Sequence, residues 1–432
     1  MKKLVHLVLC PALFVTFGCS KSTDSPGSDA GSAGNSKTEE YKNFYAANGA
    51  ELVSCLYYFN SDDLNKRMFH TERITERNGI IHYISKQYLT VAAQPTTYYG
   101  KADKLSIDTE KEPMSVKATN QVFSFSTAKA YNSYNEFDYD AQGNLMIIPY
   151  QPSFSFFPEY HGGVFAGYYN AQSGNVMGEK KREIGTATRG YLRKVGNELL
   201  FVDITRIKGY RDNDTAWDPI NMPAIPFGPA AQPKTFDFET LGTNTGYFAW
   251  TSSGGWALTG DIYVMTYANS SFGAMAKISG APVGHFAGID GNFTIQLYRN
   301  PNEADNPYVV LRTNSKFHIY TFIKSTNSIQ EVAVIPAPVS LSFNNSTRWG
   351  ACHEIEDIDF AFTGNNIYMF ALHSKLYKVV NSQFQEIIPD CIGKAADRPG
   401  IGDIEGGTKG LYMAINRNIS NKFQTDIVLL KN

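Results

Sequence analysis

Short apolar runs separated by polar turns recur along most of this chain, and this pattern predicts strands rather than helices. Four runs follow one another closely in the last third, at residues 359–362, 367–372, 376–380 and 384–388. They are rich in β-branched and aromatic residues, which favour strands. Because the polar gaps between them are short, we expect a four-stranded antiparallel meander in this region.

The same rhythm extends upstream, and glycine–asparagine pairs mark several of its turns. Gly196-Asn197, Gly291-Asn292 and Gly364-Asn365 each precede an apolar run, and these residue types supply the positive φ angles that tight hairpin turns need. Helical periodicity is scarce, and the one short helix that we expect covers residues 39–50. Further strands are predicted at residues 80–84, 88–93, 145–150, 198–204, 262–267, 293–298, 308–312, 317–323, 329–335 and 411–415.

A four-stranded meander that recurs about seven times over this length predicts an all-β fold, the β-propeller, with six or eight blades as alternatives. Each blade has two apolar faces, which become buried when the blades stack into a ring. The ring must close, so we expect the terminal strand at residues 426–430 to pair with a strand near residues 52–59. The alternative is two β-sandwich domains in tandem. The middle of the chain has no Pro/Gly/Ser-rich linker, which favours the ring.

The N-terminus has the pattern of a targeting segment. Lys2 and Lys3 precede an apolar run at residues 4–17, and Gly18-Cys19 follows that run. The run is shorter than the roughly 20 apolar residues that span a bilayer, and it has the length of a signal-peptide core. A small residue before a cysteine resembles the bacterial lipobox, in which the cysteine is diacylated and becomes the new N-terminus. The alternative is an ordinary secretory signal with a cysteine nearby by chance.

Three segments follow from this interpretation: a signal peptide at 1–18, a lipidated Cys19 with a flexible tether at 19–38, and the propeller domain at 39–432. Residues 20–37 contain no aromatic or large aliphatic side chain, so they bury too little apolar surface to offset the entropy of ordering. The Ser/Asp-rich tether resembles those of surface lipoproteins in the Bacteroidota. This resemblance implies an outer-membrane protein anchored through Cys19, at the cell surface or on the periplasmic face.

Charge argues against one class of partner, and cysteine content limits the number of disulfides. The chain has 39 Lys+Arg against 41 Asp+Glu, which gives no electrostatic footprint for nucleic acid. Beyond Cys19, the mature chain contains Cys55, Cys352 and Cys391, and three thiols permit one disulfide at most. Cys352 and Cys391 are the expected pair in an oxidising compartment, and three free thiols are the alternative.

Two acidic clusters are candidates for chemistry. Residues 353–359 could supply an acid and a base, or metal ligands, but alternate side chains of a strand point to opposite faces and would divide the cluster. Residues 212–218 carry oxygen ligands that suit a Ca²⁺ loop, yet the EF-hand glycine and glutamate are missing. The alternatives are a solvated blade edge and a polar loop. The chain has no nucleophile-elbow, zinc-protease or P-loop motif, and its 8 histidines are scattered, so we predict no catalytic residue, metal or cofactor.

Aromatic and basic side chains give a different candidate site. Residues 154–169 are crowded with Phe and Tyr between Pro and Gly, which predicts a long loop. Exposed rings can stack on sugar or catecholate rings, and the basic residues between 180 and 211 suit an anionic ligand. The alternatives are rings that fill the wedges between blades and charges that are dispersed around a solvated rim. The predicted ligand-binding residues are Tyr160, Tyr168, Tyr169, Arg189, Arg193, Arg211, Trp217, Trp256 and Trp349.

In its signal, tether and propeller rhythm, the chain resembles propeller lipoproteins that work beside TonB-dependent transporters. The resemblance implies a non-catalytic protein that captures a siderophore or a glycan for uptake, with the transporter as its partner. A second hypothesis is a propeller glycoside hydrolase or lyase that takes carboxylates from several blades. A third is a structural or adhesive lipoprotein that binds another protein.

Overall fold

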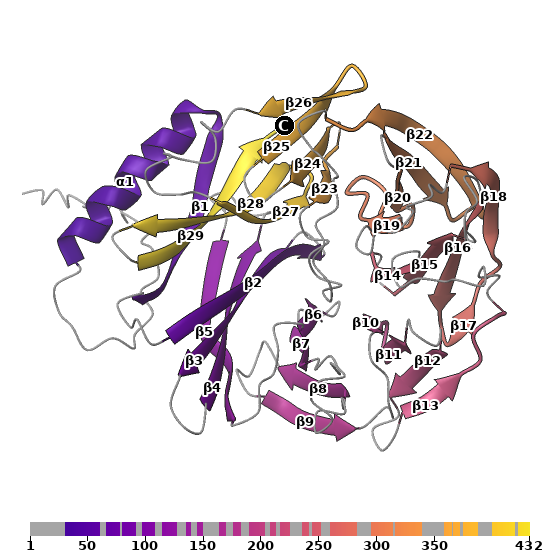
Figure 1. Cartoon of the computed structure of the whole chain (residues 1–432), viewed down its shortest axis with the longest axis horizontal. Helices are drawn as coiled ribbons and strands as arrows, with labels where there is room; N and C mark the ends of the chain where they lie inside the picture. The colour runs from indigo at the N-terminus through magenta and orange to yellow at the C-terminus, as the bar shows by residue number, and fades with distance from the viewer. Residues whose placement is uncertain are drawn as a thin grey trace, which may run out of the picture.

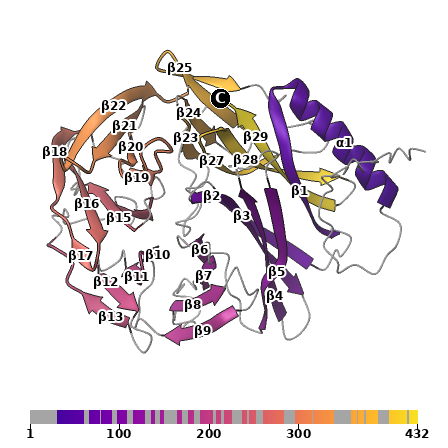
Figure 2. The ribbon, with the colours of Figure 1, turned by 180° about the vertical axis from the view of Figure 1, so that it is seen from behind.

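Seven sheets make up the described part of the chain, and they stand around a common axis as the blades of a β-propeller do (Figure 1). Figure 2 shows the same ring from behind. Neighbouring strands within each sheet are antiparallel. The computed structural model describes residues 31–60, 66–77, 80–91, 97–108, 115–127, 135–139, 145–149, 164–169, 176–182, 190–203, 208–212, 217–224, 236–241, 244–251, 260–282, 295–313, 316–338, 358–364, 366–371, 375–387, 400–419 and 422–432.

Six of these sheets are built from consecutive strands, and the first strand of each lies nearest the axis (Figure 1). The first three sheets contain β2 (Lys66–Arg77), β3 (Ile80–Val91), β4 (Thr97–Asp108) and β5 (Ser115–Thr127); β6 (Asn135–Tyr139), β7 (Leu145–Pro149), β8 (Val164–Tyr169) and β9 (Val176–Arg182); and β10 (Gly190–Val195), β11 (Glu198–Asp203), β12 (Lys208–Asp212) and β13 (Trp217–Ile220).

In the next three sheets the same meander continues. They contain β14 (Phe236–Thr240), β15 (Gly246–Thr251), β16 (Gly260–Ala268), β17 (Ser271–Phe272) and β18 (Ala276–Ala281); β19 (Ile295–Tyr298), β20 (Tyr308–Arg312), β21 (Lys316–Ile323) and β22 (Ser328–Pro336); and β23 (Ile358–Phe362), β24 (Ile367–Ala371), β25 (Lys375–Val380) and β26 (Gln383–Ile387). Both β17 and β18 pair with β16.

The seventh sheet, called the closing sheet below, joins the two ends of the chain. Its strands are β27 (Gly400–Gly406), β28 (Gly410–Ile419), β29 (Lys422–Lys431) and β1 (Ala50–Asn60), and β1 pairs with β29 on the outer side. Ala50 lies opposite Leu430, and Leu52 lies opposite Val428. The predicted pairing of the chain ends is therefore confirmed, and a pair of separate sandwiches is excluded.

Strand positions agree best with prediction in the last third of the chain. The predicted strand at 308–312 coincides with β20, and the four predicted strands between 359 and 388 correspond to β23–β26. Two predictions were wrong. Residues 80–84 and 88–91 belong to one long strand, β3, because the polar residues between them continue its ladder with β2, and residues 92–93 of the second run lie outside the described part of the chain. The predicted loop at 154–169 ends in a strand, β8, because its last six residues pair with β9 and the last three of them also pair with β7.

One helix precedes the ring. It is α1 (Gly31–Ala47), which begins earlier than the predicted residue 39 and reaches into the segment assigned to the tether. The helix ends where Gly49 adopts a φ of 74°, a conformation that glycine enters without steric cost. Both views place α1 on the outer side of the ring beside β1 (Figures 1 and 2). No helix in the described ranges is both long and apolar enough to cross a membrane.

The apolar core lies between neighbouring sheets rather than at one centre. One cluster between the sheets of β14–β18 and β19–β22 includes Val264, Val309 and Phe322, and all three are buried. Similar clusters lie between the sheets of β10–β13 and β14–β18 and between those of β19–β22 and β23–β26, and aromatic rings fill much of the space, as when Tyr308 stacks on Phe362 with ring centroids 4.1 Å apart. Burying each such side chain contributes about 1.5–3 kcal/mol, so the ring is stabilised mainly at its blade-to-blade interfaces.

Candidate functional site

The two faces of the ring differ in how its strands are connected. In an antiparallel meander, the turns after the first and third strands leave on the same side. Contacts between such turns, both between neighbouring sheets and within one sheet, place them on one face of the ring, called the turn face below. Asn302 Nδ2, after β19, donates to the Gly364 carbonyl after β23 at 2.9 Å. Asn432 Nδ2, after β29, donates to the Thr408 carbonyl after β27 at 3.2 Å.

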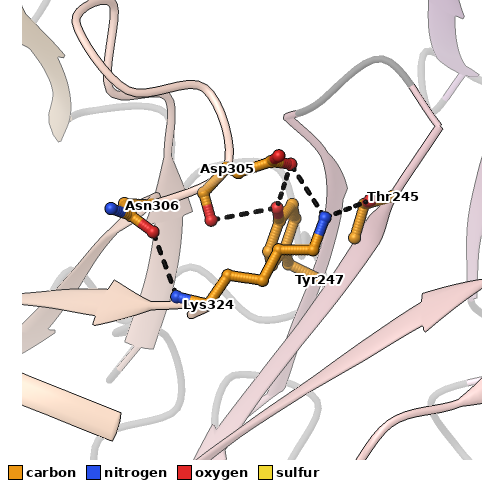
Figure 3. A network of polar contacts seen from close by, with 5 residues as sticks. All are labelled: Thr245, Tyr247, Asp305, Asn306 and Lys324. Atoms are coloured by element: carbon orange, nitrogen blue, oxygen red, sulfur yellow. Dashed lines mark hydrogen bonds and ion pairs between the residues drawn. The ribbon is translucent and has the colours of Figure 1, made fainter. Parts of the chain in front are cut away.

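A polar network locks two sheets together on the turn face (Figure 3). Lys324 Nζ lies 3.0 Å from Asp305 Oδ1 and 3.1 Å from Thr245 Oγ1. The Tyr247 hydroxyl donates to Asp305 Oδ1 at 3.1 Å, and Lys324 N donates to Asn306 Oδ1 at 3.0 Å. Thr245 and Tyr247 belong to the sheet of β14–β18, while the other three residues lie in turns of the next sheet. The network therefore fixes the position of one blade against another.

A second network on the turn face centres on a carboxylate. Glu198 accepts hydrogen bonds from Arg211 at 2.9 Å, Tyr267 at 2.8 Å and Ser270 at 2.7 Å. Partial burial alone would raise the pKa of Glu198, but these three donors reverse that effect and lower the pKa. The carboxylate is held in its charged form, and its donors come from two neighbouring sheets.

Around the axis, aspartates bridge the innermost strands of neighbouring sheets. Asp237 of β14 accepts the N–H of Leu297 in β19 at 2.7 Å, and its other oxygen accepts the N–H of Phe238 at 2.9 Å. Asp403 of β27 repeats this arrangement, with the N–H of Ile74 in β2 at 2.6 Å and the N–H of Ile404 at 3.0 Å. The innermost strand has no partner strand on its axial side, and these carboxylates satisfy N–H groups that would otherwise be left unpaired.

Ion pairs complete this group of axial contacts. Arg193 of β10 binds Glu239 of β14 through Nε at 3.0 Å and Nη2 at 2.5 Å, and Arg193 is only 2% exposed. Arg299, which follows β19, lies 3.6 Å from Glu405 of β27. The inner belt is the name used below for the residues that link the innermost strands: Arg193, Asp237, Glu239, Tyr298, Arg299, Asp359, Asp403 and Glu405.

Burial sets the electrostatics of the inner belt. Desolvation, followed by the nearby Glu239 carboxylate, raises the pKa of Asp237 to about 7, although Arg193 and the two N–H donors act in the opposite direction. Burial also raises the pKa of Tyr298 well above its usual range, with the charge of Asp359 and a hydrogen bond to it as further causes. Desolvation lowers the pKa of Arg299. Burial is therefore the main cause of the pKa shifts of Asp237, Tyr298 and Arg299.

The contacts of the belt favour a structural role over catalysis. A general acid–base pair needs groups that can reach a substrate proton. Asp237 and Asp403 instead accept two backbone N–H groups each, and Glu239 is held by an arginine. In the described ranges, no group of three or more His, Cys, Asp or Glu side chains could hold a metal ion.

The structure divides the predicted ligand-binding residues between different regions. Tyr168 and Tyr169 are the last residues of β8, Arg211 lies near the end of β12, and Trp217 begins β13, so all four lie at the ends of strands that meet the turn face. Arg193 belongs to the inner belt. The sequence alone could not show that these five residues lie in different regions, because the register of each strand decides at which end of the strand a residue lies.

The other four predicted residues lie outside the described part of the chain, as do Cys19, Cys352, Cys391 and residues 353–357 of the acidic cluster. The four residues fall in four connections, at 150–163, 183–189, 252–259 and 339–357. Each connection links strand ends that lie on the side away from the turn face, called the connection face below. The four residues are Tyr160, Arg189, Trp256 and Trp349.

Sequence reasoning missed most of the inner belt, although a signal was present. An aspartate follows the first residues of an innermost strand in the segments Phe236-Asp237-Phe238, Ile358-Asp359-Phe360 and Gly402-Asp403-Ile404. In each segment one carboxylate oxygen accepts the next residue's N–H, at 2.8–3.0 Å. A polar residue repeated at the start of three innermost strands would have identified the belt.

Comparisons with known proteins find only distant structural similarity. No protein-family model matches the chain, and no curated protein matches it. Among solved structures, the β-propeller domain of Cps50 (Swd1) from Myceliophteria thermophila is similar at 8% identity and a TM-score of 0.44, covering 84% of this chain and 98% of that one. A functionally unknown protein from Desulfotomaculum acetoxidans is similar at 12% identity and a TM-score of 0.39, covering 74% and 95%. The Dos1 propeller is similar at 11% identity and a TM-score of 0.34, covering 80% and 89%.

Proposed function

We propose that this propeller is a lipid-anchored protein of the outer membrane that binds a ligand on its connection face without transforming it. A siderophore or a glycan is the ligand class, and a TonB-dependent transporter is the partner. One observation carries the proposal: the described axial carboxylates are committed to contacts between blades, so they are poor candidates for acid–base chemistry. Binding by residues of the long connections needs no such groups.

The division of the predicted residues between regions supports the connection face as the ligand side. The turn face is occupied by short turns whose polar groups bond to one another, as in Figure 3. The connections at 150–163, 283–294, 339–357 and 388–399 join strand ends on the other side. Three aromatic side chains and one arginine in such connections suit a ligand with rings and negative charge.

A thermal-shift screen of the full chain in detergent tests the proposal, with glycans and ferric siderophores as the probes. We expect one probe to raise the melting temperature, because a ligand that binds only the folded state stabilises it. Tyr160→Ala and Trp256→Ala should reduce this shift. Tyr169→Ala and Trp217→Ala are matched controls at the turn face, and they should retain it.

Two outcomes would contradict the binding proposal. One is the absence of a shift with any probe together with measurable turnover of a glycan, which would indicate a hydrolase or lyase. The other is loss of the shift in the turn-face controls alone, which would move the site to the other side of the ring.

The anchor is tested separately. Cys19→Ser removes the thiol that the lipobox interpretation requires, so the chain should move from the membrane fraction to the soluble fraction. If the variant stays bound to membranes, the prediction of a lipid anchor at Cys19 is wrong, whatever the ligand screen shows.

A further inference from the structure

Among the side chains described in helix α1, a stripe of aromatic residues contacts the ring. Tyr41, Phe44 and Tyr45 follow the i, i+3, i+4 spacing of one helix face, and the two tyrosines are 1% and 0% exposed. They pack on a core cluster that spans the closing sheet and the sheet of β23–β26. Lys42 and Asn43 are exposed on the other side of the helix.

Beneath this stripe lies a fully buried ion pair in the closing sheet. Arg417 of β28 pairs with Asp426 of β29, and both side chains are 0% exposed. The Tyr45 hydroxyl donates to Asp426 Oδ2 at 2.7 Å, and the Arg417 guanidinium carbon lies 3.2 Å from the Tyr41 ring centroid. These four residues are called the seam cluster below.

Docking of α1 carries a polar cost that an apolar interface would not have. Removing an ion pair from water is expensive, and apolar residues of similar volume often serve at least as well. In the described part of the chain, Arg417 Nε and Nη1 and the Tyr41 hydroxyl are buried without a hydrogen-bond partner. When the helix leaves, all of these groups regain contact with water. The docked state is therefore weaker than its aromatic contacts suggest.

The strand that follows the helix is held independently. β1 pairs with β29 from Ala50 opposite Leu430 to Asn60 opposite Lys422. Between helix and ladder, Gly49 has a φ of 74° and is exposed, so it can act as a hinge. The helix can detach while the closing sheet stays intact.

We propose that α1 is a reversible strap, which docks over the seam cluster and opens without unfolding of the ring. If the chain is anchored as proposed above, the strap also changes the reach of the tether. Seventeen helical residues span about 25 Å, whereas the same residues extended reach about 55 Å. Opening would let the ring move farther from the membrane.

Hydrogen exchange of the full chain under native conditions tests the strap. The amides of residues 42–48 should exchange at least about ten-fold faster than those of β28, because the helix opens locally while the ring stays folded. The triple variant Tyr45→Phe/Arg417→Met/Asp426→Leu should slow exchange in α1 several-fold, because it removes the polar cost of docking without leaving the Tyr45 hydroxyl buried and unpaired. The matched control Glu51→Leu/Lys431→Met replaces an exposed pair of the same sheet, whose charged atoms lie 3.0 Å apart, and should leave α1 unchanged.

Exchange of α1 at the rate of β28, or exchange that the triple variant does not slow, would overturn the proposal. If the triple variant fails to fold, Tyr45→Phe alone decides. This change leaves the charged pair in place and removes its hydrogen bond to the helix, so exchange of α1 should increase while β28 stays protected, and an unchanged α1 would overturn the strap. Membrane fractionation of Cys19→Ser reports on the anchor alone, so failure of the anchor cannot be mistaken for failure of the strap.

Discussion

The inner belt and the seam cluster both join parts of the ring through buried carboxylates, but their partners differ. In the belt, Asp237 and Asp403 accept backbone N–H groups of a neighbouring strand. In the seam cluster, Asp426 accepts a guanidinium and a tyrosine hydroxyl. Every residue except proline offers a backbone N–H, so the belt arrangement can repeat around the ring. The seam arrangement instead requires three particular side chains, those of Tyr45, Arg417 and Asp426. It therefore suits a contact that is made at one place, where the chain ends meet.

The largest expected effect comes from breaking the seam pair on one side. Asp426→Ala leaves Arg417 buried without its counter-ion, which should destabilise the ring by about 3–5 kcal/mol. Urea unfolding measures this difference. The double variant Arg417→Met/Asp426→Leu is the control, since it removes both charges and should be near neutral or stabilising. A loss in the double variant as large as in Asp426→Ala would show that the pair itself holds the seam.

A belt aspartate should matter less than the seam aspartate. Asp403→Ala leaves the buried N–H of Ile74 without its acceptor, and an unsatisfied buried donor costs about 1–3 kcal/mol. Asp403→Asn keeps one carbonyl oxygen and should lose less. Equal losses for Asp403→Ala and Asp426→Ala in the same unfolding series would contradict the contrast between backbone and charged partners.

The belt should also respond to pH through Asp237. Its pKa is about 7 in the folded protein and about 4 in an unfolded chain. The folded state therefore binds the extra proton between these values, and stability falls as pH rises from about 4 to about 7. Asp237→Asn lacks this titration, so its deficit in melting temperature relative to the parent should be larger at pH 5 than at pH 8. A deficit that grows with pH would mean that the ionised carboxylate is the stabilising form.

The turn-face network should give the smallest effect. Lys324 and Asp305 are 39% and 61% exposed, and such surface pairs contribute about 0–1 kcal/mol. Lys324→Met should therefore change the free energy of unfolding by less than 1 kcal/mol. This change should be smaller still at high salt, which screens the ion pair. A loss comparable to that of Asp403→Ala would place the turn face among the main supports of the ring.

Local patterns predicted the strands because alternation and turn residues act within a few positions of the chain. The run at 308–312 coincided with β20, and the need to close a ring predicted the pairing of β1 with β29. The belt contacts were harder to foresee, since Asp237 and Leu297 are 60 residues apart and Asp403 and Ile74 are 329 apart.

The seam cluster was not predictable from local pattern. Arg417 and Asp426 look like ordinary polar residues of an exposed strand, but both are fully buried in the structure, where Tyr41 and Tyr45 of α1 contact them. The candidate ligand residues were chosen by type, and strand register placed the five described ones either at strand ends on the turn face or, for Arg193, in the inner belt. Tyr169 and Trp217 are examples, because each is fixed at a strand end by its neighbours in the ladder.

A disulfide cross-link across the closing sheet tests most directly whether the chain ends close the ring. Ala50 and Leu430 lie opposite each other, and directly paired residues of antiparallel strands have Cα atoms about 4.5–5.5 Å apart, which a disulfide can span. In Ala50→Cys/Leu430→Cys, peptide mapping after mild oxidation should find residue 50 joined to residue 430, with an increase in stability. The shifted control Ala50→Cys/Leu429→Cys points its two side chains to opposite faces and should remain unlinked. No link in the first variant, or a link only in the control, would contradict the closed ring.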